Sequence, residues 1–233
     1  MKINKLFWLG LASLIAILLI EKYTDIDVIV QNYIYDFEKH EWPINDAEHK
    51  KLTIFFYDGL KYFLMAVALC CLISLATSIK CVNLRRYNHF CLMMLLSFIF
   101  VPVIIAGAKA YTNVYCPYQL DMYDGRFPFV RILDAYPADF VQPKVGKCFP
   151  AGHSTAGFAF LGLFFAFYRP AYRVAGLLGG LTLGWIAGIY QMLRGQHFLS
   201  HTVFSMVAAL MLVYLLHFIV LSIEKRFTHF SRG

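Results

Sequence analysis

Long apolar runs are the feature that most constrains the fold of this chain. Six such runs follow one another, separated by polar loops, and they cover residues 6–20, 60–79, 90–108, 154–168, 174–193 and 202–223. About 20 apolar residues in a helix span the hydrocarbon core of a bilayer, and a backbone inside that core must satisfy its own hydrogen bonds. The runs therefore predict an all-α membrane protein, a bundle of six transmembrane helices.

The composition supports one integral membrane domain over residues 1–233. Hydrophobic residues make up 60% of the chain and charged residues 15%, whereas a soluble domain is nearer half apolar and a quarter charged. Glu21, Lys22 and Tyr23 follow the first run where a cleaved signal peptide needs small residues, so this run is expected to remain as a span. The net charge of +7 comes without a basic tract interleaved with aromatics, which argues against a nucleic acid partner.

Basic residues are concentrated in four of the segments that flank the runs. These residues are Lys2, Lys5, Lys80, Arg85, Arg86, Arg169, Arg173, Lys225, Arg226 and Arg232. The same segments contain one acid, Glu224, so the positive-inside rule places both termini in the cytoplasm and the loops at residues 21–59 and 109–152 outside. In a bacterium the outer side is the periplasm, and the predicted location is the inner membrane. The first loop mixes apolar residues with charges, which leaves open whether it caps a site or only connects two helices.

The fifth run carries a glycine at every fourth position. These glycines are Gly176, Gly180, Gly184 and Gly188. This spacing aligns small residues on one helix face and lets a neighbouring helix approach closely. It predicts a packing ridge that fixes the helix leading to residues 194–201.

Histidines stand at the outer ends of two apolar runs. His153 follows Gly152 where the fourth run begins, and Arg194, His197 and His201 follow the fifth run. Ionisable groups at such depth in a membrane protein are usually functional. If a helix begins near Arg194, the spacing of three and four residues puts Arg194, His197 and His201 on one helix face.

These groups, together with Lys109 at the end of the third run, suit phosphoryl transfer. That reaction needs cations and backbone N–H groups on the phosphate oxygens, an in-line nucleophile, and an acid for the leaving oxygen. Lys109 supplies a cation, and Arg194 supplies a forked, permanently charged donor. Gly152 allows a phosphate to approach the backbone closely.

Two of the six cysteines, Cys116 and Cys148, fall in the same outward loop. An oxidising compartment would allow them to pair. The sequence therefore predicts a disulfide that holds the two ends of the site together, with two free thiols as the alternative. The other four cysteines are expected to pack among apolar side chains.

Three segments resemble, in order and spacing, the motifs of the type 2 phosphatidic acid phosphatase (PAP2) superfamily, K-x6-R-P, P-S-G-H and S-R-x5-H-x3-D. Lys109 followed by Cys116-Pro117 resembles the first motif with Cys for Arg. Residues 150–153 resemble the second with Ala for Ser, and residues 195–200 resemble the third in its G-x-H-F-x-S form. The resemblance implies a six-helix membrane bundle with its site at the outer surface.

By position, the resemblance implies a role for each matching residue. His197 would be the nucleophile that forms a phosphohistidine, and His153 would protonate the leaving oxygen. Lys109, Gly152 and the neighbouring Ser154 would hold the phosphate.

Two positions of the third motif depart from the family pattern. Gln191 stands where the arginine is expected, and Arg194, one helical turn later, is the candidate substitute. His201 stands where the family has the aspartate that orients the nucleophile; it can accept a hydrogen bond from His197 but brings no negative charge. The loop carboxylates that remain candidates for this role are Asp121, Asp124, Asp134 and Asp139.

The leading hypothesis is a membrane lipid phosphatase that cleaves a phosphomonoester or diphosphate of a lipid at the periplasmic face. It uses no metal or other cofactor, and its partners are the phosphorylated lipid and the bilayer, with the oligomeric state left open. A phosphotransferase that uses a second lipid as acceptor is an alternative. A metal-binding protein that uses His197, His201 and His153 is another, and so is a non-catalytic protein that kept the fold.

Overall fold

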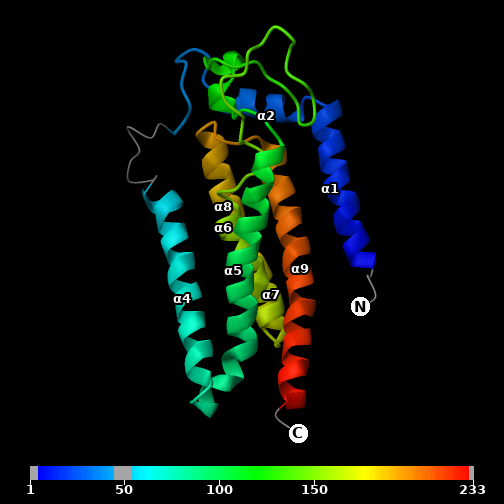
Figure 1. The fold of residues 1–233 in the computed structure, drawn as a ribbon. Helices are drawn as coiled ribbons and strands as arrows, with labels where there is room; N and C mark the ends of the chain where they lie inside the picture. Colours follow the sequence, from blue (N-terminus) through cyan, green and yellow to red (C-terminus); the bar gives the residue numbers. More distant parts are fainter. Residues whose placement is uncertain (1–4, 45–53, 231–233) are drawn as a thin grey trace.

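The computed structural model describes residues 5–44 and 54–230, and within these ranges the chain is helical with no β-strand. The long helices are α1 (Lys5–Tyr23), α4 (Leu60–Ser78), α5 (Asn88–Ala108), α8 (Pro170–Leu193) and α9 (Leu199–Phe230). The short elements are α2 (Ile26–Ile34), η1 (Ile54–Gly59), η2 (Val82–Tyr87), η3 (Lys109–Tyr111), η4 (Pro117–Gln119), η5 (Asp121–Tyr123), α6 (Thr155–Phe158), η6 (Ala159–Gly162) and α7 (Leu163–Ala166). The long helices run roughly side by side, with the loops gathered over one end of the bundle (Figure 1).

Five helices in the described ranges are long and apolar enough to cross a membrane, one fewer than the six predicted spans. The fourth predicted span, residues 154–168, instead forms the shorter apolar segment Thr155–Ala166. This segment lies among α5, α8 and α9 and is largely buried by them (Figure 1). Because protein surrounds it, it does not need the length that contact with lipid demands.

The core forms where α5 meets this central segment. Met93, Met94 and Val101 of α5 are fully buried, as are Phe158 and Leu161 opposite them. Inside a bilayer the surrounding lipid is as apolar as these side chains, so close van der Waals packing, and not removal from water, stabilises this contact. These contacts anchor the central segment, and with it the residues that precede Thr155.

The glycines of α8 form the packing ridge that their spacing predicts. A Cβ atom at Gly176 would lie 2.6 Å from Leu163, and one at Gly180 would lie 2.6 Å from the backbone of Leu161. At Gly184 it would lie 2.0 Å from the ring of Phe158. Only glycine allows α8 to approach the central segment this closely, and this approach fixes the outer end of α8.

The outer end of the bundle is covered by α2 and by the loops (Figure 1). An aromatic cluster, built from Tyr35, Tyr115, Leu120, Tyr123 and Phe198 with Trp42 and Phe127 packed against it, joins the first outward loop to the second. The first loop is therefore a cap that packs on the bundle, although its residues 45–53 lie outside the described ranges. Lys2 and Arg232, which contribute to the predicted charge bias, also lie outside them.

Candidate functional site

A pocket of about 750 Å³ opens where α5 and α8 end, at the end of the bundle that the loops cover. Its charged and imidazole-bearing lining residues are Lys109, Lys144, Lys147, His153 and His197. They come from η3 directly after α5, from the second outward loop, from the turn before α6 and from the loop between α8 and α9. The pocket therefore brings together four segments of the chain, from Lys109 to His197.

His197 reaches the pocket from a loop and not from a helix. Helix α8 ends at Leu193 and α9 begins at Leu199, so the expected helix face shared by Arg194, His197 and His201 is wrong. The rings of His197 and His201 still lie near each other, with centroids 5.8 Å apart. The loop places His197 beside the first turn of α9, which carries His201, because contacts with distant parts of the chain hold the turn of the loop.

Gly195 forms the turn of this loop. Its φ of +65° is in the left-handed region, and a Cβ atom there would lie 2.4 Å from the ring of Trp42. The backbone N–H of Tyr118 donates to the carbonyl of Gly195 over 2.9 Å. The cap and the second outward loop thus hold the chain two residues before His197.

Gly195→Ala is expected to displace His197 and to lower activity by at least about tenfold. The left-handed conformation alone costs a side-chain-bearing residue about 1–2 kcal/mol, and the contact with Trp42 adds to this. Phosphate release and thermal unfolding of the purified variant measure the effect. Gly179→Ala is the matched control, because a Cβ atom at Gly179 meets nothing within 4 Å; equal losses in both variants would contradict the prediction.

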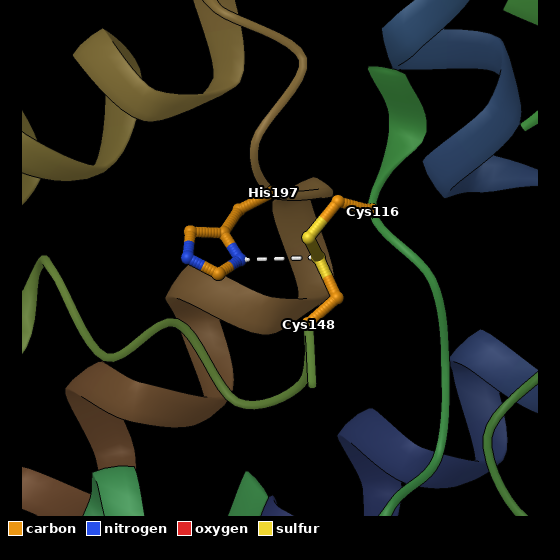
Figure 2. A group of neighbouring side chains, drawn as sticks. All are labelled: Cys116, Cys148 and His197. Carbon is orange, nitrogen blue, oxygen red and sulfur yellow. Dashed lines mark hydrogen bonds between the residues drawn. A yellow bond between two sulfur atoms is a disulfide. The ribbon is translucent and has the colours of Figure 1, made fainter. Parts of the chain in front are cut away.

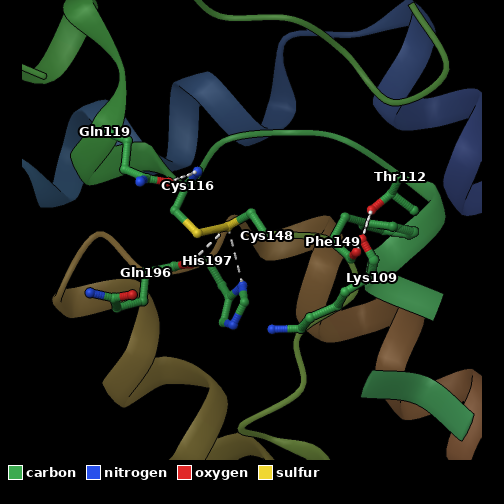
Figure 3. The surroundings of a disulfide bond; sticks show 8 residues. All are labelled: Lys109, Thr112, Cys116, Gln119, Cys148, Phe149, Gln196 and His197. Carbon is green, nitrogen blue, oxygen red and sulfur yellow. Dashed lines mark hydrogen bonds between the residues drawn. A yellow bond between two sulfur atoms is a disulfide. The ribbon is translucent and has the colours of Figure 1, made fainter. Parts of the chain in front are cut away.

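A disulfide between Cys116 and Cys148 lies directly against His197 (Figures 2 and 3). This is the predicted pair, with Cα atoms 5.0 Å apart. Of the other four cysteines, Cys71 and Cys91 are buried as expected, whereas Cys70 and Cys81 are exposed.

The sulfur of Cys148 lies 3.5 Å from Nδ1 of His197. A disulfide sulfur carries no hydrogen, so this contact suits the tautomer with its proton on Nδ1. Nε2 of His197 is then the nitrogen with the free lone pair; it is buried and has no hydrogen-bond partner among the described residues. The ring is thus oriented with an available nucleophilic nitrogen.

Lys109 and His153 complete the centre of the pocket. The rings of His153 and His197 have centroids 5.8 Å apart. The side chain of Lys109 extends toward His197 (Figure 3) and crosses Gly152 so closely that a Cβ atom there would lie 3.2 Å from Nζ. Gly152 therefore makes room for the lysine ammonium group beside the two imidazoles.

Burial and positive charge keep these two imidazoles neutral. Burial lowers the pKa of His153 from 6.5 to about 4, and the charges of Lys109 and Arg194 act in the same direction. Burial also holds the pKa of His197 well below 6.5, helped by Lys109 and the other two histidines, while a backbone hydrogen bond with Cys148 opposes the shift. A neutral His197 keeps the lone pair that a nucleophile needs.

The low pKa of His153 predicts a loss of stability in mild acid. The unfolded chain binds a proton here below pH 6.5, whereas the folded protein does so only near pH 4, so stability falls as the pH drops from about 6.5 to about 4. His153→Asn should make the thermal unfolding temperature depend less steeply on pH in this window. An unchanged slope in the variant would show that His153 does not carry this linkage.

Residues 86–224 match the family model of the PAP2 superfamily. The chain belongs to the PAP2 superfamily. No curated protein and no solved structure matches it. Membership indicates phosphatase-type activity on phosphoesters, and the apolar helices agree with a membrane location.

Gln191, which stands at the arginine position of the third PAP2 motif, contacts Arg194, the candidate substitute. The side-chain oxygen of Gln191 accepts a hydrogen bond from Arg194 over 3.2 Å, and Gln191 is almost completely buried. The positive charge of Arg194 acts on His153. Arg194 itself does not line the pocket, although contact with phosphate was expected for it.

Ser154 and His201 lie behind the pocket of this PAP2 protein and do not line it. The buried hydroxyl of Ser154 donates to the carbonyl of Ala151 over 2.9 Å, which holds the turn. His201 is buried against the rings of Phe149 and Phe198. Both residues support the site from behind, whereas direct contact with phosphate was expected for Ser154.

The loop carboxylates considered for the missing aspartate are engaged elsewhere or lie outside the pocket. Asp124 accepts hydrogen bonds from Tyr35 and His40, and Asp134 pairs with Lys22. Asp121 bonds to its own turn. In the described part of the chain, no carboxylate lines the pocket.

A buried carboxylate that the sequence analysis missed is Asp27 of α2. It accepts hydrogen bonds from the backbone N–H of Ser200, over 2.8 Å, and from the hydroxyl of Ser200. Burial raises the pKa of Asp27, and the two bonds from Ser200 oppose this shift. Asp27 caps the start of α9 at Ser200, three residues after His197, and so ties the outer cap to the loop that carries His197.

The metal site considered from His153, His197 and His201 is not assembled. Within residues 5–44 and 54–230, the group of potential ligands close enough to share an ion is Cys116, Cys148 and His197. The two sulfurs of this group are joined to each other and cannot serve as thiolate ligands.

Proposed function

We propose that this protein is a membrane lipid phosphatase that hydrolyses a phosphomonoester or a diphosphate of a lipid through a phosphohistidine. One observation carries the proposal: Lys109, His153 and His197 line a single pocket, and Nε2 of His197 has no partner among the described residues. This set supplies the cation, the acid and the nucleophile that phosphoryl transfer needs.

In the first step, Nε2 of His197 attacks phosphorus as the bond between phosphorus and the lipid oxygen breaks. Lys109 and Arg194 stabilise the non-bridging oxygens, and a protonated His153 gives its proton to the leaving oxygen. The negative charge of a bound phosphate favours this protonated form, which burial disfavours in the free protein. In the second step, water attacks the phosphorus, His153 takes the proton from the water, and phosphate leaves with His197 restored.

The outer, periplasmic face of a bacterial inner membrane is the proposed location of the site. The basic residues near the inner ends of the helices support this orientation through the positive-inside rule, with both termini in the cytoplasm. The pocket is lined by residues next to the ends of α5 and α8, so a lipid headgroup can enter it while the acyl chains remain in the bilayer.

The test is phosphate release from lipid phosphates by the purified protein. The panel contains phosphatidic acid, phosphatidylglycerol phosphate, undecaprenyl diphosphate and phosphorylated lipid A. At least one should be cleaved without added metal, and His197→Ala should abolish the release. His40→Asn, which changes an exposed histidine outside the pocket, should match wild type; activity in His197→Ala equal to wild type would refute the proposal.

A further inference from the structure

The pocket contains more positive charge than the reacting phosphate requires. Besides Lys109, it is lined by Lys144 and Lys147, whose side chains are exposed. Lys109 and Arg194 already account for the proposed contacts with the transferred group. In the described ranges, neither Lys144 nor Lys147 forms an ion pair with a carboxylate.

Hydrogen bonds of its backbone groups hold the segment that carries these two lysines in place. The hydroxyl of Tyr115 donates to the carbonyl of Lys144 over 2.5 Å, and the N–H of Gly146 donates to the side chain of Asn113 over 2.9 Å. The N–H of Cys148 donates to the carbonyl of Val114 over 3.0 Å.

Gly146 also brings this segment close to residues 113–115. A Cβ atom at Gly146 would lie 2.4 Å from the backbone of Val114. The disulfide anchors the next turn of the chain at Cys148. The backbone that carries Lys144 and Lys147 is therefore held in place at the edge of the pocket, while their long side chains can adjust to a ligand.

Lys144 and Lys147 line the pocket, and none of the carboxylates in the described part of the chain does. This excess of positive charge favours the binding of a second anion next to the first. A lysine is a compact charge that binds phosphate oxygens well. The pocket volume of about 750 Å³ exceeds what one phosphate needs, since a water molecule takes about 30 Å³ in the liquid.

We propose that Lys144 and Lys147 form a second phosphate subsite, which makes a lipid with two linked phosphates the preferred substrate. This inference rests on the proposed function. The terminal phosphoryl group moves to Nε2 of His197, the bond from its phosphorus to the bridging oxygen breaks, and that oxygen leaves as part of the lipid monophosphate. The phosphate of this leaving group is the one that Lys144 and Lys147 hold.

The direct test is calorimetric binding of methylenediphosphonate and of inorganic phosphate to the purified full-length protein. Wild type should bind the diphosphonate at least about tenfold more tightly, a difference of about 1.4 kcal/mol. Lys144→Gln/Lys147→Gln should lose this preference and keep its affinity for phosphate. Lys39→Gln, an exposed lysine outside the pocket, should keep both. Equal affinities in wild type, or a preference retained by the double variant, would overturn the subsite.

Steady-state kinetics with lipid substrates test the subsite separately from the proposed function. They also show whether the subsite acts on a lipid headgroup and not only on free phosphate. In the double variant, kcat/KM for the lipid diphosphate should fall about tenfold, whereas that for a lipid monophosphate should stay near wild type. If no lipid phosphate is cleaved but the binding preference depends on the two lysines, the subsite stands and the proposed function fails. If cleavage depends on His197 and both lipids lose activity equally in the double variant, the subsite fails and the function stands.

Discussion

His153→Ala protein incubated with an aryl phosphate is expected to accumulate a phosphoryl group on His197. An aryl oxide leaves without a proton, so the first step no longer needs His153. The second step still needs His153 to take a proton from the attacking water. Loss of a general acid–base group slows its step by about 10²–10⁴-fold, so the phosphohistidine should build up in the variant while wild type turns over.

The measurement is mass spectrometry of peptides prepared at alkaline pH, where the nitrogen–phosphorus bond survives. With lipid phosphates, whose alkoxide leaving groups need a proton, the same variant should be slow and should carry little label. His197→Ala should show no label with either substrate, and His40→Asn should behave as wild type does. A label on another residue, or none under any condition, would exclude the phosphohistidine route.

The helical architecture was predictable because it depends mainly on local sequence patterns, namely the length of the apolar runs and the spacing of the glycines. Apolar runs long enough for a bilayer gave five of the spanning helices, and the glycine spacing predicted the face of α8 that packs closely. The fourth run, residues 154–168, was counted as a span but forms only the shorter segment Thr155–Ala166, since hydropathy does not distinguish a helix that faces lipid from one enclosed by protein. Its short form is explained only by the neighbours that bury Phe158 and Leu161.

The site residues that belong to a motif were predictable from the sequence. The residues whose role depends on contacts between distant parts of the chain were not. Lys109, His153 and His197 line one pocket, as their positions in the motifs implied. The loop at Gly195 was missed because its turn depends on Trp42, which is far away in the sequence. Asp27 was missed for the same reason: it lies in a short amphipathic helix, and its contact with Ser200 spans most of the chain.

Reduction of the disulfide between Cys116 and Cys148 is expected to lower activity by at least about tenfold. The disulfide closes a loop with a sequence separation of 32 residues, a constraint that contributes about 3–4 kcal/mol on the loop-entropy estimate. The same bond holds a sulfur 3.5 Å from Nδ1 of His197 and anchors the segment that carries Lys144 and Lys147. Reduction should therefore disturb the nucleophile and the rim of the pocket while the helices stay packed.

Phosphate release and circular dichroism, each measured with and without dithiothreitol, separate these effects. Activity should fall while helix content is retained, because the long helices pack through α5 and the central segment and not through this loop. Cys116→Ser/Cys148→Ser should have low activity and should no longer respond to dithiothreitol. Cys70→Ser/Cys81→Ser, which removes the two exposed free thiols, should respond as wild type does. Full activity in the variant without the disulfide would show that the Nδ1 contact is not needed, and that another group must orient His197 in place of the missing aspartate.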